Sequence, residues 1–161
     1  MGLDIRAYKQ VEHVPHAEID EDGYPVDDDN HMKVFINDDF ASRADDIKDR
    51  SIYTTGKDSF GFRAGAYSGY NRWRNELAEL AGHGSAENVW SSGMTEGAFV
   101  ELINFSDCEG IICPKTSAKL ATDFANNEEK AKEIGGQFLE RYQNWKKAFE
   151  FAAENGLVDF H

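Results

Sequence analysis

The most reactive side chains of this sequence are concentrated in one short segment, in which a hydroxyl, a thiol and two carboxylates follow one another. These groups belong to Ser106, Asp107, Cys108 and Glu109. A thiol acts as a nucleophile when a histidine or a helix N-terminus lowers its pKa, whereas adjacent carboxylates disfavour the thiolate. Cys108 is therefore a poor candidate nucleophile. Asp107 and Glu109 could bind a cation or an arginine, unless the segment is a tight loop in which Asp107 caps neighbouring amides.

A second segment, residues 59–75, differs from the rest of this acidic chain because it contains three arginines and no acidic residue. Its glycines and serine lie at a predicted helix start, where free N–H groups and the helix dipole favour an anion. Its tyrosines could stack on a base or ring. It is not a P-loop, because the Gly-Lys-Ser/Thr ending is absent. Two interpretations remain open: a pocket for an anion or nucleotide, shared with the Asp107–Glu109 loop, and a structural turn whose arginines pair with carboxylates. The residues that would contribute to such a pocket from this segment are Arg63, Tyr67, Ser68, Gly69, Tyr70 and Arg72.

The most acidic part of the chain is residues 18–30, which contain no Lys or Arg. Its carboxylates belong to Glu18, Asp20, Glu21, Asp22, Asp27, Asp28 and Asp29. Calcium binds several such oxygens, but the terminal glutamate of an EF-hand loop is missing. The carboxylates could instead imitate a phosphate backbone and dock on a cationic partner, or form a solvated tip. The Asp22-Gly23 dipeptide predicts a tight turn, so we expect a projecting acidic hairpin over residues 18–30.

The remaining metal-ligating residue types are sparse. The histidines are His13, His16, His31, His83 and His161. None has the spacing of HExxH, and no Cys-x-x-Cys motif accompanies them. His13, His16 and His31 could meet in a three-histidine metal site if the strand holding His31 returns toward the other two. The favoured expectation is no metal and no cofactor. Cys108 and Cys113 are too few for a disulfide framework, and we expect them to be reduced.

Alternating patterns predict strands in the first third of the chain. Leu3, Ile5 and Ala7 alternate with polar residues, as in a half-buried strand. Further strands are expected at 31–37, 51–54 and 60–63, the last two joined by a turn that contains Gly56. A short helix capped by Asp38 or Asp39 should follow the second strand.

Helical spacing dominates the rest of the chain. Tyr70, Trp73, Leu77 and Leu80 predict an amphipathic helix over 69–81, with Ser68 as N-cap and Gly82 as its left-handed stop. Residues 83–95 are expected to form a loop anchored by Trp90, and 97–105 fit either a short helix or a buried strand. Pro114 should begin another helix. A long helix is expected over 128–155, weakened at its beginning by Gly135-Gly136, and the apolar tail 157–161 should dock on the domain.

These elements predict one α+β domain over residues 1–161, with a small, mainly N-terminal antiparallel sheet packed against helices that include a long C-terminal one. The length of 161 residues suits a single domain. The formal net charge of -13 argues against general nucleic-acid binding and against adsorption to anionic membranes. Neither a signal peptide nor a membrane-spanning segment is recognisable, so a cytoplasmic location is expected.

Three stretches of the sequence together resemble a family of small uncharacterised proteins from bacteriophage and bacterial genomes. They read R-A-G-A-Y-S-G-Y-N-x-W-R, F-x-E-L-I-N-F-S-D-C-E-G and W-x-x-A-F-E-x-A-A followed by V-D-F-H. The resemblance covers roughly residues 60–161 and the opening Met-Gly-Leu-Asp, but not the acidic hairpin. It implies a shared role for Gly65–Arg74, Ser106–Gly110 and Asp159–His161, and it implies no particular activity.

Two functions from different classes follow from these observations. The favoured one is a phage-type accessory protein, not an enzyme, that binds and modulates a host or defence protein through its acidic surface. Such a protein would act as an inhibitor or a nucleic-acid mimic. The alternative is a binding protein for a small nucleotide-like anion, or a small hydrolase, with a pocket between the Arg63–Arg74 segment and the Asp107–Glu109 loop.

Overall fold

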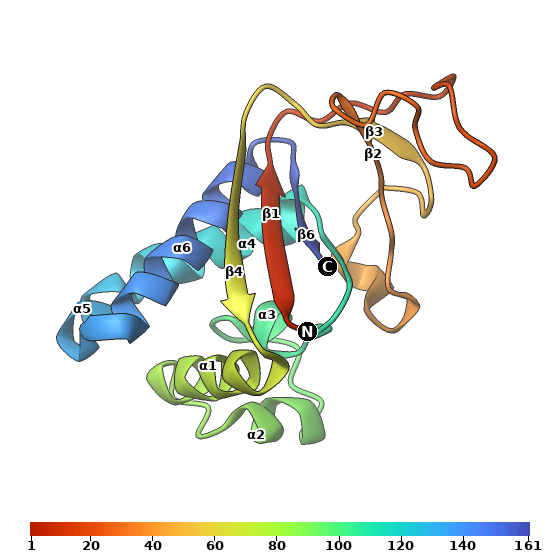
Figure 1. Cartoon of the computed structure of the whole chain (residues 1–161). Coiled ribbons are helices and arrows are strands. Elements are labelled where there is room, and N and C mark those ends of the chain that lie inside the picture. The colour runs from red at the N-terminus through yellow and green to blue at the C-terminus, as the bar shows by residue number, and fades with distance from the viewer.

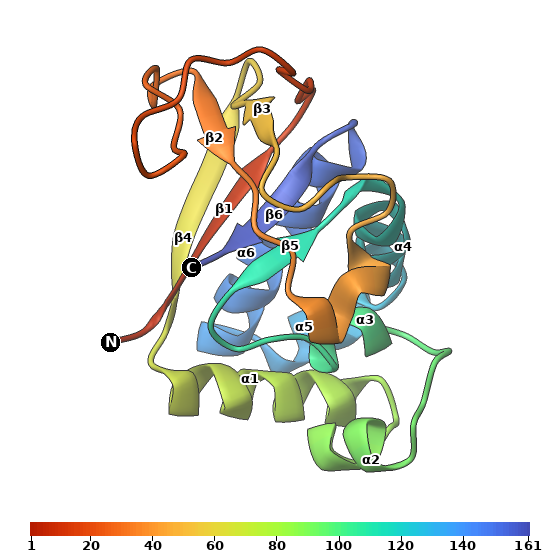
Figure 2. The same cartoon turned by 90° about the vertical axis from the view of Figure 1, so that its right-hand side faces the viewer.

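Four antiparallel strands form the main sheet in the order β4–β1–β6–β5 (Figures 1 and 2). Their bounds are Leu3–Tyr8 for β1, Ser59–Gly65 for β4, Gly110–Ile112 for β5 and Leu157–Phe160 for β6. The computed structural model describes residues 1–161. In β1, side-chain alternation buries Leu3, Ile5 and Ala7 on one face of the sheet and places Asp4 and Arg6 on the other. The sheet therefore has one apolar face and one polar face.

Helices pack against the apolar face and against one another. They are α1 (Tyr67–Leu80), α2 (Ala86–Ser91), α3 (Val100–Ile103), α4 (Pro114–Asn126), α5 (Glu128–Ile134) and α6 (Gly136–Ala153). In Figure 1, α4 and α6 lie behind the sheet, and α1 and α2 lie below it. Trp145 of α6 joins these layers, because its ring centroid is 5.1 Å from that of Phe62, 5.6 Å from that of Phe160 and 5.8 Å from that of Tyr70. The predicted single α+β domain with a small antiparallel sheet and a long C-terminal helix is confirmed.

Residues 9–58 form an excursion between β1 and β4 that covers part of the polar face (Figure 2). It contains the two-stranded ribbon β2 (His31–Lys33) and β3 (Ile52–Thr54), and the 3-10 helix η1 (Asp38–Arg43). Val11, Val34 and Ala44 pack with Ile111 and Leu157 in a small second core. The excursion therefore covers the β5–β6 part of the polar face and leaves the β1–β4 part open to solvent.

Several helix boundaries differ from the sequence predictions. α1 begins at Tyr67 with Ala66 as N-cap, so Ser68 lies inside the helix and does not cap it. Residues 83–95 were predicted to be a loop, but they contain α2, whose N-terminus is capped by the Ser85 hydroxyl accepting from the Asn88 N–H. Gly82 has a φ of 81° immediately after α1, as predicted.

The predicted helix over 128–155 is two helices. Gly135 and Gly136 have φ values of 66° and 57°, which a continuing right-handed helix does not allow, and the chain changes direction there. α5 ends before this pair and α6 begins at it. None of the helices combines the length and the apolar character needed to cross a membrane.

The differences between the predicted and the observed strands arise from pairing between segments that are distant in sequence. The apolar tail docks as predicted, but it does so as β6 in the middle of the main sheet. The two strands on either side of Gly56 do not pair with each other: β3 pairs with β2, and β4 pairs with β1. Of the two alternatives for residues 97–105, the chain adopts the helical one, as the short helix α3.

Candidate functional site

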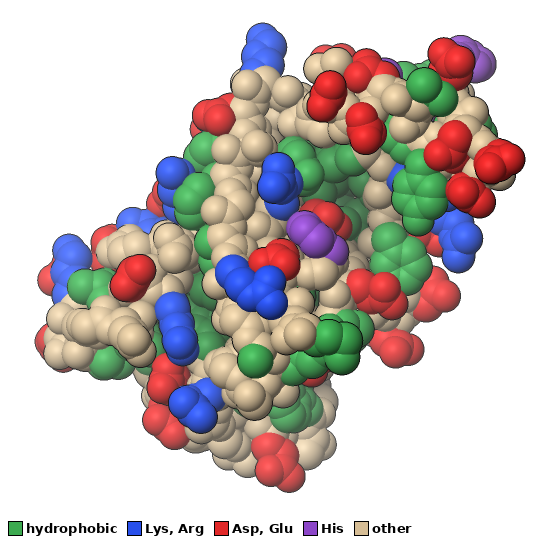
Figure 3. Space-filling view, in the orientation of Figure 1, with side chains coloured by type: hydrophobic (Ala, Val, Ile, Leu, Met, Phe, Trp, Pro, Cys, Tyr) green, Lys and Arg blue, Asp and Glu red, His purple; other side chains and the backbone are tan.

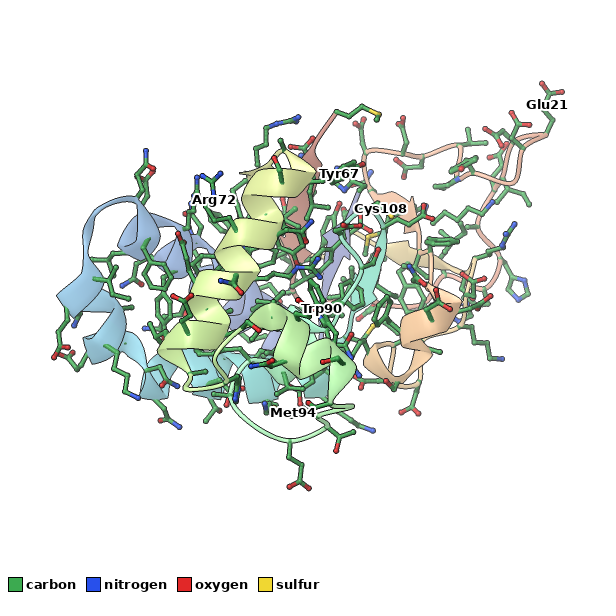
Figure 4. The ribbon with its side chains drawn as sticks, turned by 90° about the horizontal axis from the view of Figure 1, so that it is seen from below. Glu21, Tyr67, Arg72, Trp90, Met94 and Cys108 are labelled. Carbon is green, nitrogen blue, oxygen red and sulfur yellow. The ribbon has the colours of Figure 1, made fainter.

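The structure brings together two segments that carry the candidate binding residues, and the contact runs through Arg74. Its Nη2 lies 4.0 Å from a carboxylate oxygen of Asp107. Arg63 instead pairs with Asp4 across the sheet at 2.9 Å. Arg72 is exposed, and Figure 4 shows it on the opposite side of α1 from Cys108. Arg63 and Arg72, the two arginines that the sequence suggested for the pocket, therefore lie outside the place where the segments meet.

Arg74 is only 5% exposed, and it holds the loop after α3, residues 104–109, to α1. Its Nη1 donates to the carbonyl oxygens of Ile103 at 3.2 Å and Phe105 at 2.6 Å, and its Nη2 donates to the Asn71 side chain. The guanidinium carbon lies 4.7 Å from the Tyr70 ring centroid and 4.9 Å from that of Trp90. Because residues four apart share a helix face, Tyr70 and Arg74 are neighbours on α1. The hydrogen bonds of the guanidinium and its contacts with the two rings fix the position of this loop.

The hydroxyl of Ser106 organises this loop. It accepts the backbone N–H groups of Cys108 at 3.2 Å and Glu109 at 3.1 Å. Ser106 therefore takes the capping role that the sequence suggested for Asp107. The Cys108 thiol is exposed, with its Sγ 3.5 Å from the Ser106 hydroxyl, whereas Cys113 is buried, and both cysteines are free.

The other candidate residues of α1 do not converge on this loop. Tyr67 and Gly69 are half-buried and Ser68 is exposed in the first turns of the helix, and Tyr70 is buried beneath Arg74. Glu109 is exposed, and its backbone carbonyl accepts from the Asn37 side chain. The residues that do meet beside Arg74 and Asp107 include Trp90, Asn71 and Asn104, which sequence reasoning did not select. The four-residue spacing of Tyr70 and Arg74, which places both on one face of the helix, was the one sequence signal that pointed to this cluster.

Residues 18–30, named here the acidic arm, project from the domain; Glu21 marks its tip in Figure 4. A preformed turn holds the tip: the Asp20 carboxylate accepts the N–H groups of Asp22 at 3.0 Å and Tyr24 at 2.8 Å, and the Val26 N–H donates to the Glu18 carbonyl at 2.9 Å. The Asp27 carboxylate accepts from the Asn30 side chain. Side chains without any hydrogen bond or ion pair are those of Glu18, Glu21, Asp22, Asp28 and Asp29.

The acidic arm also exposes apolar side chains. Ile19, Tyr24 and Val26 are 55%, 57% and 55% exposed, and they are three of the seven large hydrophobic residues of the protein that are exposed. Two cations lie close to the arm: the Nζ of Lys33 is 4.4 Å from the Tyr24 ring centroid, and Arg50 lines a pocket together with Ile19. The arm therefore presents both negative charge and apolar surface.

The histidines do not assemble a metal site. No group of three His, Cys, Asp or Glu side chains has a geometry that could hold a metal ion. His13 packs on Tyr53, with ring centroids 5.3 Å apart, and His31 pairs with Thr54 in the ribbon, so the three-histidine arrangement does not form. His83 Nε2 lies 2.8 Å from the Ala98 carbonyl oxygen.

His161 lies on the open part of the polar face, where its Nδ1 is 3.1 Å from a carboxylate oxygen of Asp159. The β1–β6 register places Asp159 beside Arg6, and Asp4 bonds to the His161 backbone. Figure 3 shows a histidine with basic and acidic side chains over this face. The hydrogen bond to Asp159 raises the pKa of His161 above its ordinary value, and this effect outweighs the desolvation that lowers it.

Because the native pKa of His161 is raised, its contact with Asp159 contributes to the stability of the fold, and this contribution decreases as pH rises. The contact stabilises the fold fully below the unfolded-state pKa of about 6.5, and this stabilisation is lost as pH rises through the higher native pKa. We expect the excess in Tm of the wild type over His161→Gln to be full below about pH 6.5 and to shrink as pH rises through the higher native pKa of His161. The effect is small because the pair is partly exposed. Thermal unfolding of both proteins measures it, and an excess that is constant with pH would contradict the assignment.

No family model, no curated protein and no solved structure matches this chain.

Proposed function

We propose that this chain is an accessory protein that binds another protein through the acidic arm. The observation that carries the proposal is the combination of exposed apolar side chains and unpaired carboxylates on one projecting, preformed turn. Protein interfaces concentrate binding energy in a few buried anchors, and aromatic residues such as Tyr24 are enriched among them. The charged rim around such anchors accelerates encounter and selects a complementary partner.

The partner of this surface should carry a cationic groove with an apolar pocket. In the arm, Tyr24 and Val26 would enter the pocket, and the free carboxylates of Glu21 and Asp22 would face its basic rim. Figure 3 shows acidic side chains beside apolar ones across this projecting part. The preformed turn reduces the ordering entropy lost on binding. The resemblance to small phage proteins favours a host or defence protein as the partner, with inhibition or modulation as the result.

The first test removes charge without disturbing the turn. A variant with Glu21→Gln, Asp22→Asn, Asp28→Asn and Asp29→Asn keeps the structural carboxylates of Asp20 and Asp27. A partner captured from bacterial lysate by the wild type, then purified, should bind this variant at least about tenfold more weakly, which corresponds to about 1.4 kcal/mol. The loss should diminish as salt rises, since screening already weakens the wild type.

A matched control separates the arm from the overall charge. Neutralising four exposed carboxylates elsewhere, Glu87, Glu96, Glu133 and Glu140, changes net charge equally and should leave binding within about twofold. The double variant Tyr24→Ser with Val26→Ser should lose affinity while keeping the salt dependence. Equal binding by the arm variants and the control would contradict the proposal.

A further inference from the structure

A pocket of ≈ 530 Å³, named here the Arg74 pocket, opens where α1, η1 and the loop after α3 meet. Its volume is within the range of small-molecule sites, about 300–1,000 Å³, but the pocket is wide and largely open to solvent. The side chains that line it include Asn37, Asn71, Asn104, Asp39, Asp107 and Trp90. They come from four separate parts of the sequence and include none of the arm residues, so this inference is independent of the proposed function.

Some polar groups of the Arg74 pocket are already bonded and others are free. Asn37 is bonded at both ends of its amide: it accepts from the Asp39 N–H at 3.1 Å and donates to the Glu109 carbonyl at 3.3 Å. Asn71 uses its oxygen for Arg74, which leaves its NH₂ group free. The side chains of Asn104 and Asp39 have no hydrogen bond or ion pair. The pocket therefore offers free amide donors together with the free carboxylate of Asp39.

The charge of the Arg74 pocket disfavours an anionic ligand. One cation, Arg74, and two anions, Asp39 and Asp107, give a sum of one minus two, or -1. Both carbonyl contacts of Arg74 use Nη1, Nη2 is engaged by Asn71 and faces Asp107, and Nε has no partner but is buried away from the surface. A phosphate would find no free cation and would meet two carboxylates. An uncharged ligand with hydroxyl groups fits better, since a hydroxyl donates to a carboxylate and accepts from an amide.

Trp90 supplies a fixed apolar wall. Its indole N–H donates to the Ile103 carbonyl at 2.8 Å, and the Arg74 guanidinium packs on its ring, yet the residue is 40% exposed. An exposed aromatic surface next to hydrogen-bonding groups accommodates a ring that is apolar on its face and polar at its edge. A carboxylate that binds ribose hydroxyls is a recurrent device in nucleotide sites. We propose that the Arg74 pocket binds a sugar ring through vicinal hydroxyls, in a free carbohydrate or in the ribose of a nucleoside.

Tryptophan fluorescence offers a local readout, because Trp73 and Trp145 are each 1% exposed and Trp90 alone is open to solvent. The probes are the methyl glycosides of glucose, mannose and galactose, then adenosine and uridine, with inorganic phosphate as the charged comparison. Calorimetry should accompany the fluorescence titrations. At least one uncharged probe should give a saturable signal. Binding by glycosides alone indicates a carbohydrate, and binding by nucleosides indicates the ribose source.

Deoxy analogues and variants test the assigned chemistry. The 2-deoxy counterpart of the bound probe should bind at least about tenfold more weakly, because the pocket groups would lose their partner. Asn104→Ala and Asp39→Ala should each weaken binding by about tenfold with an unchanged Tm, since neither side chain makes a hydrogen bond within the protein. Arg72→Ala, on the other side of α1, should bind normally. The proposal is overturned by an absent signal at about 10 mM probe, by binding of phosphate alone, or by wild-type affinity in both pocket variants.

Discussion

Replacing Arg74 with alanine should lower the free energy of unfolding by about 3–4 kcal/mol, because hydrogen bonds from charged groups contribute about 1.5–3 kcal/mol each. The change leaves the carbonyl groups of Ile103 and Phe105 without their buried donor. It also empties the space between the Tyr70 and Trp90 rings. Urea unfolding measures the loss, and Tm should fall by about 10 °C for a chain of this size.

Variants at neighbouring positions give this prediction its controls. Arg72→Ala changes the same residue type on the same helix at an exposed position, and should alter stability by no more than about 0.5 kcal/mol. Arg74→Lys should recover part of the loss, because an ammonium cannot reproduce the planar fork that reaches both carbonyls and Asn71. A loss in Arg74→Ala as small as that in Arg72→Ala would show that Arg74 does not hold the loop.

Gly156→Ala should destabilise the protein by about 3 kcal/mol or more, because overpacking and lost hydrogen bonds add. A Cβ at position 156 would lie 1.8 Å from the Tyr8 carbonyl oxygen and 2.8 Å from the Lys9 Cα. Both are backbone atoms, so no side-chain rotation relieves the overlap. The chain before β6 would have to move away from the end of β1. That movement would break the bonds from the Gln10 N–H to the Glu154 carbonyl at 2.8 Å and from the Val11 N–H to the Asn155 carbonyl at 3.0 Å.

Substitution of a second glycine is expected to have the opposite effect on stability. Gly69 lies in α1 with nothing within 4 Å of an added Cβ, so Gly69→Ala should stabilise the protein by up to about 1 kcal/mol through helix propensity. Chemical denaturation of both variants provides the comparison. Hydrogen exchange should show that Gly156→Ala loses protection first at the Gln10 and Val11 amides. A Gly156→Ala protein as stable as the wild type would contradict the close approach of the two segments.

The two proposed surfaces can be tested independently. The acidic arm and the Arg74 pocket share no residue, so variants at Asp39 and Asn104 should retain partner binding while losing the sugar probe. Conversely, the arm variants should retain the probe. Mutations more than about 7–10 Å apart without shared partners usually act additively, which makes the double variants informative.

Local patterns in the sequence determined much of the fold. The alternation of Leu3, Ile5 and Ala7 predicted β1, and the helical spacing of Tyr70, Trp73 and Leu77 predicted α1 together with its end at Gly82. These signals are local because side-chain direction follows from the backbone period alone. The turn at Asp22-Gly23 was predicted from contiguous residues as well, but its flanks form one isolated bridge, between Ile19 and Pro25, in place of the paired strands of a hairpin.

Pairing between distant segments was decided only by the tertiary structure. The tail 157–161 was predicted to dock, but its place between β1 and β5 depends on hydrogen bonds to strands far away in sequence. The separation of β3 from β4 into different sheets has the same origin. Composition and periodicity report the local backbone state and the buried face of a segment, and they do not report its partner.

The candidate site likewise depends in part on the local sequence and in part on the tertiary structure. The sequence singled out the arginine-rich segment and the Asp107 loop, and it proposed that they meet. Only the packing of α1 against that loop selects Arg74 over Arg72, because two positions along a helix differ by about half a turn and face opposite sides. Packing also adds Trp90 and Asn104 to the pocket. The sequence determined which chemical groups are present, and the tertiary structure decided which of them share a pocket, because that depends on contacts between residues remote in the chain.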